Sequence, residues 1–342
     1  MFKKIAAIVL CLTMITLVGC SKKKTDNNSS VISSESEPVV VYYQNNLTGE
    51  ENITDKEKVN NRPVAIMINN ISVAQKVQTG LTKADIIYET EVEGGITRLM
   101  AVYKDISKVK KVGTVRSARY PYIDLAMGHG AIYIHHGMDR HYAKPHLRDT
   151  QTLTLDTNNA GVRIRNEGLA IEHTLYGKGP EIAKWLEKKN YNTKLETVEN
   201  WQNFAEKDEK VTFTDSAKKV TVKFSGCSTS VFKYNEKSEK YVRYFYDTKR
   251  TDYYTGKSEK FKNLFVLKTA ITNYPDGKHK KVDLYSGKGY YCVNGTYTPI
   301  KWKKGNSSDS LKFTDLEGNP LKVNRGNTWV CFHSNVFKPA FE

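Results

Sequence analysis

The chain has 342 residues, with 53 Lys or Arg against 37 Asp or Glu, and its formal net charge is +16 at neutral pH. This length allows two domains with hydrophobic cores of their own. The abundance of Tyr, Lys and Asn favours strands and polar loops over long helices. No apolar run after the N-terminus approaches the length of a membrane span, which argues against a polytopic membrane protein.

The N-terminal segment has the pattern of a bacterial secretion signal. Lys3 and Lys4 give a positive start, an apolar run follows from Ile5 to Val18, and Gly19 precedes Cys20. Lipoprotein processing reads this pattern, so we expect residues 1–19 to be removed as a signal peptide and Cys20 to be lipidated, with palmitate among the acyl groups. Two acyl chains anchor a protein stably. The expected location is the extracytoplasmic face of the cell membrane. The alternative is a signal peptide that happens to end near a cysteine.

Composition then divides the mature chain into a tether and two domains. Residues 20–61 are polar and Ser-rich at their start and are expected to form a disordered tether. Residues 20–200 are nearly balanced in charge at +3, whereas residues 201–342 hold 26 basic and 15 acidic side chains. Such a basic module could dock on anionic lipids or cell-wall polymers, and nucleic acid is a poor partner in that compartment. The alternative is that scattered lysines merely solvate a β surface.

Residues 62–196 predict an α/β or α+β domain with a mixed sheet. Val64 to Ile68 and Ala131 to His135 are short apolar runs typical of buried strands, and Lys110 to Val115 predicts another strand. Tyr122 to Met127 and Gly179 to Lys189 predict helices. Strands therefore alternate with helices in this part of the chain.

Residues 197–342 predict a mainly β domain. Six short extended runs are separated by turn signals such as Pro275-Asp276-Gly277 and Asn294-Gly295. Cys227, Cys292 and Cys331 lie in this segment, so at most one disulfide can form among them. The simplest interpretation is that all three are buried thiols.

A predicted hairpin carries the first candidate site. Gly94-Gly95 separates two extended runs, and this loop would place Glu91 directly opposite Arg98. Strand alternation puts Glu89, Glu91 and Glu93 on one face. These carboxylates could hold a cation, serve as acid or base, or simply pair with arginine.

The second candidate site is Arg116-Ser117-Ala118-Arg119, between a predicted strand and the helix that follows it. Ser117 could cap the helix, and two guanidinium groups would recognise phosphate or carboxylate. The alternative is an ion network with the acidic hairpin and no ligand. The candidate ligand-binding residues are Arg98, Arg116, Ser117, Arg119, Glu91 and Glu93.

Six of the eight histidines fall between residues 129 and 173, but their spacing matches no metal motif, so we expect no metal site. His136, at a strand end, is the preferred catalytic histidine, and Asp85 and Glu89 are the candidate carboxylates. The sequence has no P-loop, dinucleotide fingerprint or nucleophile elbow, and no cofactor is expected.

Four stretches resemble the YerB-like bacterial lipoproteins, a family with paired N- and C-terminal domains of unknown function. They are residues 62–70, 80–89, 92–98 and 112–119. This chain has Asn69 where an Asp is usual, Thr114 where a Pro is usual, and Glu172-His173-Thr174 near an expected Pro-His-Asn. The resemblance implies a location and a domain layout but no reaction.

Three hypotheses follow. The first is an envelope lipoprotein that binds an anionic ligand or wall component through the arginines. The second is an enzyme acting on a wall phosphate or glycan, because the acidic strand and arginine loop also resemble those of LytR-CpsA-Psr transferases. The third is a structural partner of another envelope protein, which would show an exposed apolar patch.

Overall fold

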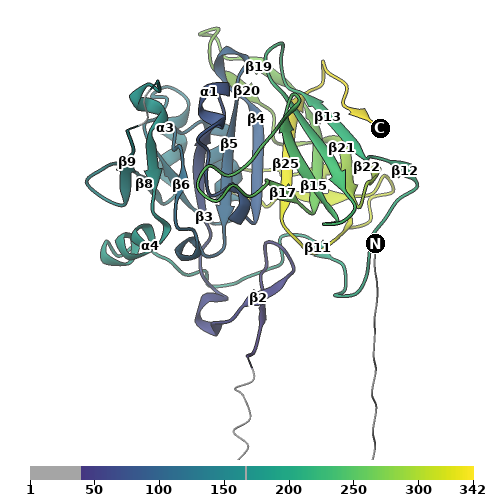
Figure 1. Ribbon diagram of the computed structural model, residues 1–342, viewed down its shortest axis with the longest axis horizontal. Helices are drawn as coiled ribbons and strands as arrows, with labels where there is room; N and C mark the ends of the chain where they lie inside the picture. The colour runs from purple at the N-terminus through teal and green to yellow at the C-terminus, as the bar shows by residue number, and fades with distance from the viewer. Residues whose placement is uncertain (1–39, 166–167) are drawn as a thin grey trace, which may run out of the picture. The chain divides into compact units, whose positions relative to one another are not determined.

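A long mixed sheet is the main element of the computed structural model, which describes residues 40–165 and 168–342 (Figure 1). Its strands follow the order β12 (Asp215–Ser216), β22 (Thr296–Lys303), β21 (Ser286–Val293), β18 (Asn263–Thr269), β25 (Thr328–Ser334), β4 (Ile86–Glu91), β5 (Thr97–Tyr103), β3 (Val64–Asn69), β7 (Ile132–His135) and β8 (Thr152–Thr154), with β23 (Lys312–Thr314) paired to β22. The predicted combination of a mixed sheet in the N-terminal part and a mainly β C-terminal part is confirmed.

A second sheet and four small ones complete the strands. The second has the order β16 (Thr248–Lys249), β15 (Lys240–Phe245), β14 (Thr229–Asn235), β13 (Lys219–Lys223) and β26 (Ala340–Phe341), with β17 (Lys260–Phe261) on β15. The small sheets are β6 (Val112–Gly113) with β10 (Leu175–Gly177) and β9 (Gly161–Arg163), β1 (Tyr43–Gln44) with β2 (Glu51–Ile53), β11 (Asn203–Phe204) with β24 (Lys322–Val323), and β19 (Ile271–Asn273) with β20 (Lys280–Val282).

The helices are few and short. They are α1 (Ser72–Gln75), α2 (Tyr120–Met127), α3 (Ala143–His146) and α4 (Gly179–Lys188), with 3-10 turns at η1 (Lys56–Lys58), η2 (Leu81–Lys83), η3 (Glu93–Gly95), η4 (Ile106–Lys108), η5 (Leu147–Asp149) and η6 (Ile171–His173). Both predicted helices are therefore confirmed, as α2 and α4. Each has a proline in its first turn, where the missing N–H costs no hydrogen bond. Within the described residues, no helix has the length and apolarity needed to cross a membrane.

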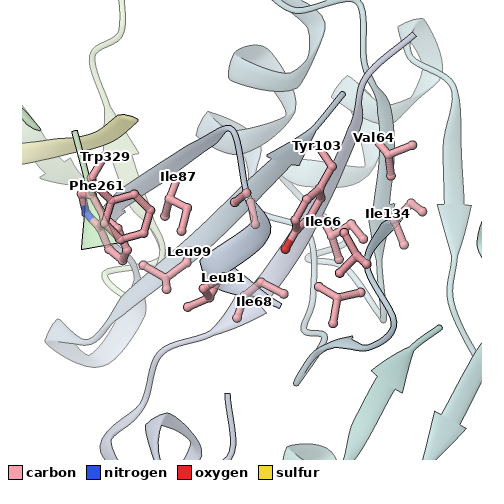
Figure 2. Packing of buried hydrophobic residues seen from close by; sticks show 14 of the residues in the cluster. Val64, Ile66, Ile68, Leu81, Ile87, Leu99, Tyr103, Ile134, Phe261 and Trp329 are labelled. Atoms are coloured by element: carbon pink, nitrogen blue, oxygen red, sulfur yellow. The ribbon is translucent and has the colours of Figure 1, made fainter. Parts of the chain in front are cut away.

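The central strands are apolar on both faces because both faces of the long sheet are covered. On one face, here called the β-covered face, Ile66 and Leu99 share a cluster with residues of the second sheet and of α4. Figure 2 shows Phe261 beside Trp329 in this cluster. On the opposite, helix-covered face, Met67 and Met100 pack with α2 and α3. Continuous apolar runs such as Val64–Asn69 are the expected result of burial on both sides.

The segments before and after residue 197 share the long sheet. Strand β25 lies parallel to β18 on one side and to β4 on the other. Residues 41–342 accordingly form one compact unit. The division into domains 62–196 and 197–342 stays a prediction about chain organisation.

Part of the segment predicted to be a tether is ordered. Residues 41–61 contain β1, β2 and η1, and Leu47 is buried against the helix-covered face. Asn45 also donates a hydrogen bond to Asp85, at 2.8 Å. These contacts fix a polar segment that the sequence pattern alone marked as disordered. Cys20 and the signal peptide lie outside the described residues.

A buried ionic network joins strands of the two sheets. Arg243 on β15 is fully buried and donates to Glu259 at 2.9 Å and to Asn70 at 2.9 Å. Its guanidinium lies 4.6 Å from the centre of the Trp329 ring. Asn70 in turn donates to Glu89 on β4, at 3.0 Å. Desolvated charges are tolerated when they are paired and hydrogen-bonded in this way.

The three cysteines are free thiols, and the expectation that all are buried is wrong for one of them. Cys292 and Cys331 lie in the core, where burial raises the pKa of each thiol. Cys227 is exposed, in the turn between β13 and β14, because that turn is solvent-facing.

Removing one charge of the Arg243–Glu259 pair should cost far more stability than removing a surface charge. We expect Glu259→Gln to lower the free energy of unfolding by about 3 kcal/mol, because it leaves Arg243 buried without a counter-charge. The matched control, Glu181→Gln, breaks an exposed pair with Lys178 and should cost less than about 0.5 kcal/mol. Urea unfolding followed by circular dichroism measures both; equal losses in the two variants would contradict the importance of the buried pair.

His333 should make the fold sensitive to mild acid. It is fully buried on β25, neither ring nitrogen has a hydrogen-bond partner within the described residues, and burial lowers its pKa to about 4. Between pH 6.5 and 4, His333 is protonated in the unfolded chain but stays neutral in the folded chain. The free energy of unfolding therefore falls as the pH falls.

We expect the stability of the wild type to drop by about 2 to 3 kcal/mol more than that of His333→Leu between pH 7 and pH 4.5. Urea unfolding at a series of pH values gives the difference. His141→Leu, at an exposed position, serves as the control and should follow the wild type. Parallel pH profiles of the wild type and His333→Leu would exclude this histidine as the cause.

Candidate functional site

The hairpin β4–β5 is present, but its register differs from the predicted one. Arg98 pairs with Thr90, and Glu91 pairs with Thr97. The connection is longer than Gly94-Gly95, since Val92 donates to the carbonyl of Ile96 across η3. A shift of one residue moves a side chain to the other face of a sheet. The predicted pairing of Glu91 with Arg98 is therefore wrong: Glu89 and Glu91 lie on the β-covered face, and Arg98 lies on the helix-covered face.

Arg98 is a buried cation without a counter-charge. Its side chain is 3% exposed, and one N–H group donates to the backbone carbonyl of Ser117 at 3.0 Å. Its Nε has no hydrogen-bond partner, and no carboxylate of the described residues lies within 4 Å. Burial, reinforced by the charge of Arg116, lowers its pKa to about 10. An arginine in this state is set up to receive an anion.

The segment from Thr114 to Arg119 crosses the ends of β3 and β7 beside Arg98. Its backbone is held by hydrogen bonds from Arg116 to Met67 and from Ala118 to Gly137. Arg116 is half-buried, donates to the carbonyl of Glu172 at 3.2 Å, and leaves its own Nε without a partner. Burial also lowers the pKa of Arg116. Two poorly neutralised guanidinium groups therefore face the same region.

Ser117 does not have the capping role that its position suggested. Helix α2 begins at Tyr120 after Arg119, and no side chain caps its first turn. The Ser117 side chain is half-exposed and lies near Gly137. Its backbone carbonyl is what contacts Arg98, so any role of this serine at the site runs through the main chain.

Arg119 differs from the other two arginines because it is already neutralised. It forms a two-point ion pair with Glu93, one arm of which measures 2.8 Å. Glu91 pairs with Lys280 of β20, at 2.9 Å. The acidic hairpin is thus matched by Arg119 and by a lysine from the C-terminal segment. The hypothesis of an ion network without a ligand fits these two pairs. It does not fit Arg98 or Arg116, which form no ion pair within the described residues.

The three candidate acid/base residues do not converge. Asp85 lies at the start of β4, accepts hydrogen bonds from Asn45 and from the Lys104 backbone, and burial raises its pKa to about 6. Glu89 is buried on the β-covered face and accepts from four side chains, Asn70, Thr97, Ser230 and Trp329. Burial raises its pKa. Neither carboxylate shares a face with Arg98.

His136 is the only one of the three beside the arginines. Its backbone N–H donates to the carbonyl of Arg116 at 3.0 Å. Its Nδ1 lies 2.7 Å from the carbonyl of Leu155, which fixes Nδ1 as the protonated nitrogen, so Nε2 accepts from Arg163 at 3.1 Å. Both ring nitrogens therefore already have hydrogen-bond partners. The bond to Nε2 also brings Arg163 into the same region as Arg98 and Arg116.

The other histidines of the 129–173 segment have separate structural partners. His129 bonds to the Tyr88 hydroxyl, His135 to Thr152, and His173 to Asn69. Within residues 40–165 and 168–342, no group of three or more His, Cys, Asp or Glu is placed to hold a metal ion. Asn69 stands opposite Arg98 in the sheet and donates to His173, which places an amide, not a carboxylate, beside the buried arginine.

Tyr133 belongs to this cluster and was missed from the sequence. It lies on β7, on the helix-covered face, and its buried hydroxyl has no hydrogen-bond partner among the described residues. Burial raises its pKa, and the nearby charges of Arg119 and Arg98 oppose that shift. The strand Ala131 to His135 was recognised, but apolar residues on both of its faces hid which one pointed at the arginines.

Family comparison identifies both parts of the chain. Residues 47–192 match the N-terminal domain model, and residues 220–330 the C-terminal domain model, of a protein of unknown function called DUF3048. A Bacillus subtilis (strain 168) protein described as "Putative lipoprotein YerB" is 28% identical over 285 residues, which span 81% of this chain and 82% of the relative.

A solved structure agrees with the sequence match. The crystal structure of the YerB protein from Bacillus subtilis aligns with a TM-score of 0.75 and 26% identity, covering 88% of this chain and 99% of that one. The two domain models together match more than half of the chain. The chain therefore belongs to the DUF3048 family of YerB-like proteins, as the four sequence stretches indicated.

Proposed function

We propose that this chain is a membrane-anchored lipoprotein of the cell envelope that binds an anionic ligand through Arg98 and Arg116. The observation that carries the proposal is Arg98, a cation that is 3% exposed and lacks a carboxylate partner within the described residues. Burying an uncompensated charge costs several kcal/mol, and a bound anion would recover that cost.

The donors around Arg98 favour an oxyanion such as a phosphate group. The Nε atoms of Arg98 and Arg116 and the hydroxyl of Tyr133 are hydrogen-bond donors without partners. Guanidinium groups form paired hydrogen bonds with phosphate or carboxylate oxygens, which lysines cannot do. Arg116 and Ser117 are half-exposed, so the site has an approach from solvent.

Two observations support the proposed lipid anchor. The sequence ends its apolar N-terminal run at Cys20, and the Bacillus subtilis relative is described as a lipoprotein. A protein held at the extracytoplasmic face of the cell membrane meets wall polymers and lipid headgroups that carry phosphate. The excess of basic residues after position 200 would favour such anionic surfaces through long-range attraction.

Binding of inorganic phosphate tests the site directly. We expect titration calorimetry of the chain from residue 21 to detect binding that weakens from 50 to 300 mM NaCl, values set by the range over which surface attraction is screened. Arg98→Met should weaken the affinity about 10-fold or more, because it removes the buried cation. A glycerol-phosphate oligomer, used as a second probe, should bind more tightly than the single phosphate if wall polymers are the source.

Two variants sharpen the interpretation. Arg140→Met removes an exposed arginine outside the site and should leave binding unchanged. Glu93→Gln frees Arg119 from its ion pair and should tighten binding. Circular dichroism confirms that each variant is folded. A folded wild type that ignores both probes, or an Arg98→Met variant that binds as the wild type does, would rule out this function.

A further inference from the structure

A cavity separate from the arginine site lies beside α2 and is lined mainly by C-terminal loops. Its volume is about 580 Å³, within the range of small-molecule sites. Helix α2 contributes Tyr120 and Asp124, and the segments near β20 and β22 contribute most of the remaining wall. None of the arginines of the anion site lines it.

Asp124 lines this cavity, and one of its carboxylate oxygens has no hydrogen-bond partner in the part of the chain that the structure describes. The residue is 8% exposed, and its Oδ1 accepts no hydrogen bond within the described residues. The Nδ1 of His146 lies 3.6 Å from that oxygen, beyond hydrogen-bond distance. Burial raises the pKa of Asp124. A buried acceptor without a donor is rare in folded proteins, and Asp124 belongs to the wall of this cavity.

Lys304 presents the complementary donor. It is 3% exposed, and its ammonium donates to the backbone carbonyls of Asn306 and Ser307, at 2.8 and 2.5 Å. An ammonium group has three N–H donors, so one remains for a ligand. The same two bonds hold the 305–309 loop, which Asp309 further fixes by accepting from the Asn306 backbone at 2.8 Å. The wall of the cavity is therefore preformed.

The rest of the lining is polar, aromatic and balanced in charge. Lys281 and Asp283 add one charge of each sign to those of Lys304 and Asp124. Tyr285 also lines the cavity and is 59% exposed, so its ring is available for stacking. Tyr120 is fixed through its hydroxyl, which donates to the carbonyl of Val282 at 2.9 Å. Balanced charge gives no preference for a net anion or cation.

We propose that this cavity binds a neutral oligosaccharide. Sugar hydroxyls both donate and accept hydrogen bonds, so one ligand can satisfy Asp124 and the remaining N–H of Lys304 at once. The apolar face of a pyranose ring can pack on Tyr285. A phosphate would meet Asp124 and Asp283, and an alkylammonium ligand would meet Lys281 and Lys304, so each carries a penalty that a neutral polyol avoids.

The test titrates the chain from residue 21 with chitotriose and with maltotriose, followed by calorimetry. We expect at least one of them to bind, and we expect Tyr285→Ala and Asp124→Asn each to weaken that binding about 10-fold. Tyr253→Ala removes an equally exposed tyrosine outside the cavity and should have no effect. The two trisaccharides distinguish an N-acetylated sugar from a plain hexose.

Separate probes keep this inference distinct from the anion site. Arg98→Met should weaken phosphate binding and leave trisaccharide binding unchanged, while Asp124→Asn should weaken trisaccharide binding and leave phosphate binding unchanged. The proposal is overturned if the folded wild type binds neither trisaccharide, or if binding persists unchanged in both Tyr285→Ala and Asp124→Asn. It is also overturned if Asp124→Asn leaves trisaccharide binding unchanged. A change only in the affinity for inorganic phosphate, or for glycine as a zwitterionic probe, would count in the same way.

Discussion

The position of β25 between β18 and β4 is the constraint on which the rest of the structure depends. This strand gives the long sheet its continuity from the C-terminal strands to the N-terminal ones. It also places Trp329 where its ring contacts Arg243 and its indole N–H donates to Glu89. The buried ionic network can exist only because these groups are delivered to one place and shielded together. Packing and charge pairing therefore reinforce the same arrangement.

Charged side chains on the two faces of the long sheet differ in whether they have a partner of opposite charge. On the β-covered face, Glu89 accepts hydrogen bonds from several side chains, and Arg243 is paired with the carboxylate of Glu259. On the helix-covered face, Arg98 and Arg116 keep donors without acceptors. Arg98 and Arg116 therefore differ from Arg243 in having no carboxylate partner among the described residues. The contrast between faces is what separates structural charge from a candidate binding site.

Local patterns predicted the elements well and their mutual placement poorly. The apolar run at Val64 to Ile68 and the helices after Arg119 and before Lys189 were correctly assigned, because period and turn signals are local properties. The register of the β4–β5 hairpin was wrong, because the connection contains Val92 to Ile96 and not two glycines alone. That one-residue error placed Arg98 beside Glu91, whereas in the structure Arg98 pairs with Thr90 and has no carboxylate partner among the described residues. Partners such as Lys280 and Ser230 come from distant segments, and spacing within one sequence carries no signal for them.

Strand β25 also constrains the order in which the fold can form. Thr90 on β4 contacts Phe332 on β25, 242 positions later in the chain. One edge of β4 therefore stays unpaired until almost the entire polypeptide is present, and such distant pairings are slow to form. A chain of this design stays incomplete throughout its synthesis. The long sheet can therefore close only when the last of its strands, β25, is available.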